Sequence, residues 1–196
     1  MAQSIYQYRG INNWNDVIKN TFDDDCEIKY LLKSYRTTTE IMNSANNITK
    51  FINIKPAQPV IRHGVDVEFI KYNEDEKVKI ILGIIEKYKQ NGYKSIAIIC
   101  KDDEETNLIN SNLREKDVNI KNVVNSETQY EGGICTITSY LAKGLEFDGV
   151  IISNASEEKY NSAKLIDMKL LYVSMTRPLH ELKILYNDNL VKPLKS

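Results

Sequence analysis

Three short stretches of this sequence place a positively charged side chain where it could contact a flat or anionic ligand. Tyr35–Arg36 follows an apolar run, Lys143–Gly144 lies within YLAKGLEFD, and Arg177 stands just before a proline. A tyrosine ring can stack on a base, and the planar fork of an arginine can grip a phosphate. A glycine lets the backbone approach a ligand closely, and Glu146 could accept hydrogen bonds from ribose hydroxyls. Taken one at a time, these features are more typical of solvated turns and helix ends than of a ligand site.

The apolar pattern predicts the elements that must position these residues. Short apolar runs alternate with longer segments of helical period, which is typical of β-α units whose parallel sheet is covered on both faces. Ligands of open α/β sheets gather outside the carboxyl ends of strands, so we expect residues 34–38 and the opening stretch 2–10 to share a site there. The predicted strands are 28–32, 67–72, 95–100, 134–138, 150–153 and 182–186, and the predicted helices are 38–52, 75–91, 103–115 and 165–175.

Length and composition favour one soluble globular domain. The 196 residues carry a net charge of -1 with a pI near 6.2, so any contact with nucleic acid must be local. Three scattered cysteines without a CxxC pair are typical of reduced thiols in a cytoplasmic protein. No apolar stretch is long enough to span a bilayer, and there is no signal-peptide pattern. We therefore expect a cytoplasmic protein that does not contact a membrane.

The sequence does not contain a complete nucleotide site. The acidic run at 102–105 follows the predicted strand 95–100, as the magnesium-holding acids of a Walker B motif would. Acids in the first turn of a helix also offset its dipole, and we prefer this interpretation. No Gly-Lys-Ser/Thr phosphate loop is present to supply the other half of such a site. We therefore expect the isolated chain not to hydrolyse ATP.

Four ordered stretches together resemble motifs of UvrD-like superfamily 1 helicases. SYRTTTEI (34–41), TSYLAKGLEFDGVII (138–152) and LLYVSMTRPLHEL (170–182) resemble motifs IV, V and VI, and AQSIYQYRG (2–10) is similar to the end of motif III. The resemblance implies an α/β, three-layer RecA-like domain of the P-loop NTPase type, with a mainly parallel sheet and no phosphate loop of its own. Residues 21–196 would form this second motor domain. Residues 1–20 would be a remnant of the motif III region, poorly packed, in an excised fragment or a shortened gene product.

The same resemblance implies site residues, cofactors and partners. ATP with Mg²⁺ would be held mainly by an absent N-terminal motor domain, with no metal site in this chain, and the nucleic acid would be single-stranded or duplex DNA. The arginines Arg36 and Arg177 would be catalytic, reaching the γ-phosphate across the cleft. The resemblance implies ATP contacts for Gln3, Tyr35, Arg36, Gly144, Glu146 and Arg177, and nucleic-acid contacts for Tyr6, Tyr8, Arg9, Thr138, Tyr140 and Lys143.

One departure from the family pattern points to a particular branch and leaves alternatives open. Tyr140 stands where typical members have histidine, and together with QPVIRHG (58–64) it is closer to the HelD and helicase IV branch. That branch includes bacterial proteins that bind RNA polymerase, which is therefore a candidate partner, and DNA contact through Tyr6 and Tyr140 is left open. The alternatives are a HelD-like recycling factor and a non-hydrolytic, flavodoxin-like α/β binding domain, in which Arg36, Lys143 and Arg177 would lie far apart.

Overall fold

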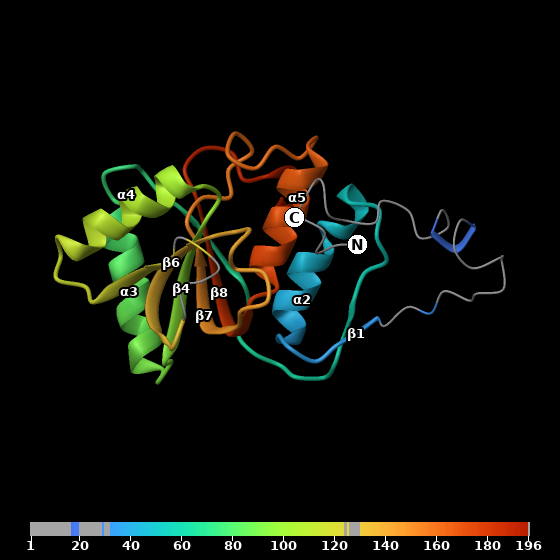
Figure 1. Cartoon of the computed structure of the whole chain (residues 1–196), viewed down its shortest axis with the longest axis horizontal. Helices are drawn as coiled ribbons and strands as arrows, with labels where there is room; N and C mark the ends of the chain where they lie inside the picture. Colours follow the sequence, from blue (N-terminus) through green and yellow to red (C-terminus); the bar gives the residue numbers. More distant parts are fainter. Residues whose placement is uncertain (1–16, 20–28, 30–31, 124, 126–129, 196) are drawn as a thin grey trace.

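The computed structural model describes residues 17–19, 29, 32–123, 125 and 130–195, and its main element is a six-stranded sheet (Figure 1). The strands run in the order β3-β8-β7-β4-β6-β5, and all their pairings are parallel. The expected α/β fold with a mainly parallel sheet is thus confirmed. The strands are β3 (Glu68–Lys71), β4 (Ser95–Cys100), β5 (Ile120–Val123), β6 (Gly133–Thr138), β7 (Phe147–Ile152) and β8 (Pro178–Tyr186).

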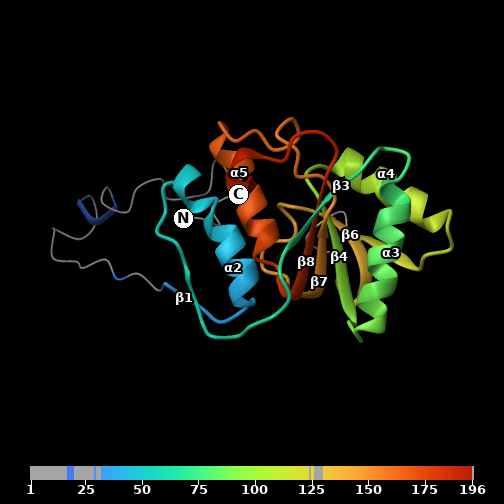
Figure 2. The ribbon, with the colours of Figure 1, turned by 180° about the vertical axis from the view of Figure 1, so that it is seen from behind.

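Helices cover both faces of the sheet and complete three layers. Helices α3 and α4 lie on one face, and α2 and α5 lie on the other, as the two opposite views show (Figures 1 and 2). No described helix is long and apolar enough to cross a membrane. The helices are α2 (Thr39–Asn46), α3 (Lys77–Gln90), α4 (Asp103–Arg114) and α5 (Leu165–Met175), and the short 3-10 helices are η1 (Thr49–Phe51) and η2 (Lys192–Leu194).

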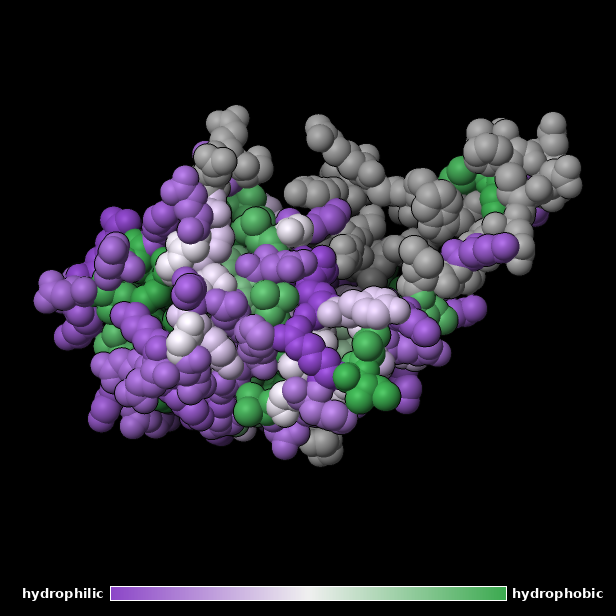
Figure 3. All heavy atoms as spheres, turned by 90° about the horizontal axis from the view of Figure 1, so that it is seen from below, coloured by the Kyte–Doolittle hydropathy of each residue, from purple (hydrophilic) through white to green (hydrophobic). Residues whose placement is uncertain are grey.

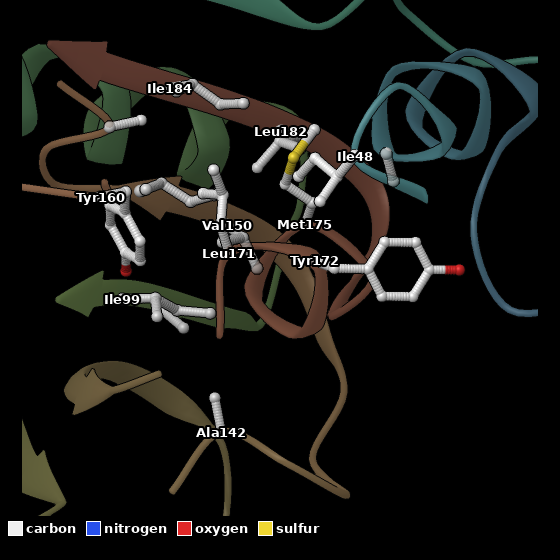
Figure 4. Packing of buried hydrophobic residues seen from close by; sticks show 14 of the residues in the cluster. Ile48, Ile99, Ala142, Val150, Tyr160, Leu171, Tyr172, Met175, Leu182 and Ile184 are labelled. Atoms are coloured by element: carbon white, nitrogen blue, oxygen red, sulfur yellow. The ribbon is translucent and has the colours of Figure 1, made fainter. Parts of the chain in front are cut away.

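Two apolar clusters hold the layers together, one on each face of the sheet. Leu171 of α5 packs with Val150 of β7 in the first cluster (Figure 4). Ile81 of α3 packs with Ile98 of β4 in the second. These side chains are fully buried, and burying one such side chain contributes about 1.5–3 kcal/mol. A sheet buried on both faces needs strands that are apolar at successive positions, which is what β4 and β7 show.

Helix α3 comes unusually close to the sheet at β7. A Cβ atom at Gly149 would lie 2.6 Å from the ring of Tyr88, so only glycine allows this approach. The Tyr88 hydroxyl donates to the carbonyl oxygen of Val150 at 3.1 Å, which satisfies a polar group that would otherwise be buried without a partner. The start of β7 is thereby fixed against α3.

A second, two-stranded sheet has one strand before α2 and one after it, and differs from the expectation. Strands β1 (Lys33–Ser34) and β2 (Gln58–Pro59) pair in parallel, and neither joins the main sheet. The strand predicted at 28–32 lies largely outside the described residues. The helix predicted over 38–52 ends at Asn46, because the chain tightens into η1 before the loop to β2. Strand β5 was not predicted.

Candidate functional site

Arg36, Glu146 and Arg177 meet at one edge of the main sheet, and we call them the amino-end cluster. Glu146 immediately precedes β7, and Arg177 immediately precedes β8, so both lie at the amino ends of neighbouring strands. Arg36, in the bend before α2, donates from Nε to Oε1 of Glu146 at 2.5 Å. Both partners of this ion pair are partly exposed, at 36% and 45%, so the pair is open to exchange with another ligand.

Arg177 is the buried member of the amino-end cluster. Its side chain donates to three acceptors: Nε to the Val173 carbonyl at 2.9 Å, Nη2 to the Thr176 hydroxyl at 3.1 Å and Nη1 to the Leu145 carbonyl at 3.3 Å. Burial, reinforced by the positive charge of Arg36 and opposed by Glu146, lowers the pKa of Arg177 to about 10. The side chain therefore stays charged at neutral pH, and its three bonds fix the guanidinium beside the segment that carries Glu146.

An open hollow of about 190 Å³ adjoins the cluster between β1, α2 and the end of α5. Arg36, Tyr172 and Thr176 contribute to its walls, and Figure 4 shows the Tyr172 ring pointing away from the core of the apolar cluster. Tyr35, next in sequence to Arg36, is 71% exposed, so its ring is available for stacking. Figure 3 views the molecule from this side, where hydrophilic side chains predominate and apolar ones form small patches.

The position of this cluster corrects one expectation from the sequence. Residues 34–38 were expected at the carboxyl end of a strand of the main sheet. Strand β1 pairs only with β2, so the chain delivers Arg36 from outside the main sheet to the amino ends of β7 and β8. The opening stretch that was expected to share the site lies outside the described residues.

The segment 139–146 connects the opposite edges of the sheet and carries several predicted residues. It starts after Thr138 at the carboxyl end of β6 and ends with Glu146 at the amino end of β7, and β4 lies between these two strands. Lys143 and Gly144 are exposed in its turns. Gly144 has a φ of 93°, a conformation that L side chains rarely adopt.

Thr138 and Tyr140 lie at the carboxyl edge, away from the amino-end cluster. Thr138 is fully buried, and its Oγ1 has no hydrogen-bond partner in the described part of the chain. The Tyr140 hydroxyl donates to Oδ1 of Asp103 at 3.2 Å. The structure thus separates these two residues, predicted to contact nucleic acid, from those predicted to contact ATP.

A network of charges at the carboxyl edge was missed by the sequence analysis. It lies after the ends of β3, β4 and β7, and Glu105 at its centre is only 8% exposed. Glu105 accepts from Lys77 Nζ and from the Ser153 hydroxyl, at 2.9 and 2.8 Å, while the Asp102 side chain caps α4. The partners are too distant in sequence to be predicted. We call Lys77, Lys101, Lys159, Asp102, Glu105 and Asp167 the carboxyl-end network.

Two further predictions concern residues or ligands that the structure does not place. Gln3, Tyr6, Tyr8 and Arg9 lie outside the described residues, as does most of the segment 1–20, so their roles stay predictions. Among the residues that are described, no group of three or more His, Cys, Asp or Glu side chains could hold a metal ion.

Comparison with known proteins finds similarity to helicase C-terminal domains. Residues 119–189, which include Glu146 and Arg177, match the family model of the UvrD-like helicase C-terminal domain. Over these residues the chain is similar to the C-terminal domain of UvrD-like helicases. The crystal structure of the C-terminal domain of a possible DNA helicase from Lactobacillus plantarum WCFS1 matches it with a TM-score of 0.68 and 26% identity. That match covers 83% of this chain and 92% of the other, and supports the RecA-like helicase fold.

A DNA helicase is also similar to this chain. DNA helicase II of Rickettsia typhi (strain ATCC VR-144 / Wilmington) is 26% identical over 168 residues, which are 80% of this chain. The matched part is 24% of that helicase, so this chain spans about a quarter of its relative's length. The assignment to the HelD and helicase IV branch stays a prediction.

Proposed function

We propose that this chain is the second motor domain of an ATP-dependent superfamily 1 DNA helicase or translocase. It would close on ATP that is held, with Mg²⁺, by an N-terminal motor domain carrying the phosphate loop. The observation that carries this proposal is the meeting of Arg36, Glu146 and Arg177 at one edge of a domain whose residues 119–189 are similar to UvrD-like helicases. A flavodoxin-like binding domain would leave Arg36 and Arg177 far apart, so their proximity favours the motor domain.

Each member of the amino-end cluster has a role suited to its chemistry. Arg36 would exchange its ion pair with Glu146 for the γ-phosphate, which is feasible because that pair is half-exposed. The freed carboxylate of Glu146 would then accept hydrogen bonds from the ribose hydroxyls. Arg177, already fixed by carbonyl groups, would present its charge to the same phosphate. The exposed ring of Tyr35 would stack on adenine.

Arginine suits the two phosphate contacts better than lysine. The guanidinium keeps its charge even when burial lowers its pKa, and its planar fork matches phosphate oxygens. Such arginines, supplied across a cleft, increase turnover roughly 10³- to 10⁵-fold. Release of the γ-phosphate would remove the ligand that draws the two domains together, so hydrolysis would open the cleft.

Contact with DNA would involve the carboxyl edge and the segment 139–146. Lys143, exposed in the turn, would make the contact, and Thr138, whose buried hydroxyl has no partner in the described part of the chain, would reach it only if this segment moves. Tyr140 would be free to contact nucleic acid only by giving up its hydrogen bond to Asp103. RNA polymerase as a partner rests on the likeness of Tyr140 and QPVIRHG to the HelD branch, and it is a prediction of the sequence alone.

The test compares the isolated chain with the protein that joins it to its N-terminal motor domain. We expect DNA-stimulated ATP hydrolysis by the joined protein and none by the isolated chain, because the isolated chain lacks a phosphate loop. Arg36→Lys in the joined protein is the matched variant, since it keeps the charge and loses the fork. Turnover that scales with the isolated chain through rigorous purification would refute the proposal, as would a joined protein that does not hydrolyse ATP.

A further inference from the structure

Arg62 joins two segments that carry members of the amino-end cluster. Its Nη1 donates to the carbonyl oxygen of Arg36 at 3.1 Å, and its Nη2 contacts Nδ1 of His180 at 2.7 Å. His180 lies at the start of β8, the strand that Arg177 immediately precedes. A single side chain therefore links the backbone of Arg36 to the strand beside Arg177.

His180 is held from two more directions. Its ring stacks on Tyr93, with ring centroids 5.6 Å apart and planes inclined by 16°. Its Nε2 lies 3.8 Å from Oδ1 of Asp148, at the start of β7 close to Glu146. Two backbone N–H groups around the start of β4 donate to that carboxylate at 2.8 and 2.9 Å. The contact of Arg62 with His180 is thus anchored on β4, β7 and β8 together.

The backbone around Arg36 depends on this link. Arg36 lies in a bend between β1 and α2, where no strand or helix within the described residues provides a donor for its carbonyl oxygen. Arg62 provides that donor through its side chain. Its own carbonyl oxygen also accepts from the backbone N–H of Thr39, in the first turn of α2, at 2.9 Å. The bend that aims Arg36 at Glu146 is therefore fixed on both sides by one residue.

We propose that Arg62, supported by His180, is a positioning residue that holds Arg36 in place for its contact with the γ-phosphate. The two acceptors lie on different elements, and only a guanidinium has two terminal nitrogens that can reach both. A lysine would keep the charge but could not make both bonds. The effect on Arg36 geometry follows from the contacts alone, whereas the effect on turnover rests on the proposed function.

The first test measures Arg36 in this chain alone, by NMR of its Nε–Hε group. The hydrogen bond to Glu146 slows the exchange of this proton with water. Glu146→Gln gives the exchange rate that is expected when the pair of Arg36 with residue 146 is weakened. We expect Arg62→Lys and His180→Ala to speed that exchange about tenfold, toward the Glu146→Gln value. His180→Asn keeps an acceptor oxygen near the position of Nδ1 and should restore the slow exchange. Arg114→Lys, which changes an arginine of α4 that donates to the carbonyl oxygen of Ile120 in β5, should leave it unchanged.

The second test measures kinetics in the joined protein. We expect Arg62→Lys to lower kcat about tenfold while the KM for ATP changes less than twofold, because a misplaced contact that is made in the transition state mainly affects turnover. A merely structural role would instead lower the amount of folded protein and leave the kcat of the remainder unchanged.

The outcomes separate this inference from the proposed function. Arg36 exchange that is identical in Arg62→Lys and in the unsubstituted chain would overturn the inference, whatever the kinetics show. Faster exchange with an unchanged kcat would overturn the role in turnover. Absence of any ATP hydrolysis in the joined protein would refute the proposed function, while the NMR result would still decide whether Arg62 positions Arg36.

Discussion

The two edges of the same sheet handle charge in opposite ways. At the amino edge, the arginines bond to carbonyl groups, to a histidine and to one half-exposed carboxylate. At the carboxyl edge, the carboxyl-end network pairs three lysines with three carboxylates, and Glu105 at its centre is almost fully buried. Bonding to neutral carbonyls fixes an arginine without cancelling its charge, whereas a lysine–carboxylate network cancels its own. The amino edge therefore keeps positive charge available for an anion.

Loss of the Arg177 side chain should have the largest effect on the amino edge. In the joined protein, we expect Arg177→Ala to cut turnover at least a hundredfold, since arginines of this kind increase turnover roughly 10³- to 10⁵-fold. The affinity for ATP should fall less, and steady-state kinetics with ATP titrations measure both. Comparable losses in turnover and in affinity would mean that Arg177 only supports the fold through its carbonyl bonds.

Substitutions in the carboxyl-end network should lower the free energy of unfolding rather than the turnover of ATP. Glu105→Ala leaves Lys77, whose side chain is 11% exposed, without its partner, and breaking a buried pair in this way costs about 3 kcal/mol. Urea unfolding of the isolated chain measures this loss. Glu104→Ala, an exposed acid in the same turn of α4, is the control and should change stability by less than about 0.5 kcal/mol. Equal effects of the two variants would show that the network does not stabilise the fold.

Tyr35 offers a smaller test at the amino edge. Because its side chain is 71% exposed, Tyr35→Ala should leave the unfolding free energy unchanged. The loss of stacking should weaken ATP binding by the joined protein about tenfold, and Tyr35→Phe should retain the affinity. Isothermal titration with a non-hydrolysable ATP analogue measures the difference. Unchanged affinity in Tyr35→Ala would remove this residue from the adenine site.

The smallest expected effect concerns pH and the segment that carries Arg62. His63 Nδ1 and the backbone N–H of Gly64 lie 2.9 and 2.8 Å from the Glu40 carboxylate. These hydrogen bonds, the one with His63 above all, lower the pKa of Glu40 from its usual 4.5 to about 2. A lowered pKa in the folded state means that the stabilisation is present above about pH 4.5 and is lost as the pH falls toward 2.

Amide exchange at Gly64 measures this pH dependence. The Gly64 N–H should become less protected as the pH falls through that window. Glu40→Gln, which cannot titrate, should remove the dependence on pH. A Gly64 protection factor that stays constant from pH 5 to pH 2 in the unsubstituted chain would contradict the assignment to Glu40.

The regular elements were largely predictable from the sequence. Strand β4 and helix α5 begin and end where the apolar pattern predicted, because a long apolar run with clear ends defines the bounds of its element. Strand β5 was not predicted because it reads IKNV, with Lys121 and Asn122 at its centre. It is a strand only because it pairs with β6 at the edge of the sheet, and pairing of that kind does not show in a local pattern.

The candidate site was predictable in its residues but not in its geometry. The motifs named Arg36, Glu146 and Arg177, and the structure brings them together, while their roles stay predictions. The predicted edge of the sheet was wrong for Arg36, because the sequence did not reveal that β1 pairs only with β2. The bridge through Arg62 and His180 joins residues 118 positions apart, and nothing local to either residue signals it.

The strand order has a consequence for how the chain folds. Strand β8 lies between β3 and β7, so β3 has no neighbour in the sheet until residues 178–186 have been added. Glu68 and Lys183, paired across β3 and β8, are 115 residues apart. Closing so long a loop is slow. During synthesis, β3 therefore remains unpaired until β8 is inserted beside it. We expect β3 to be the segment most open to mispairing or chaperone contact during that time.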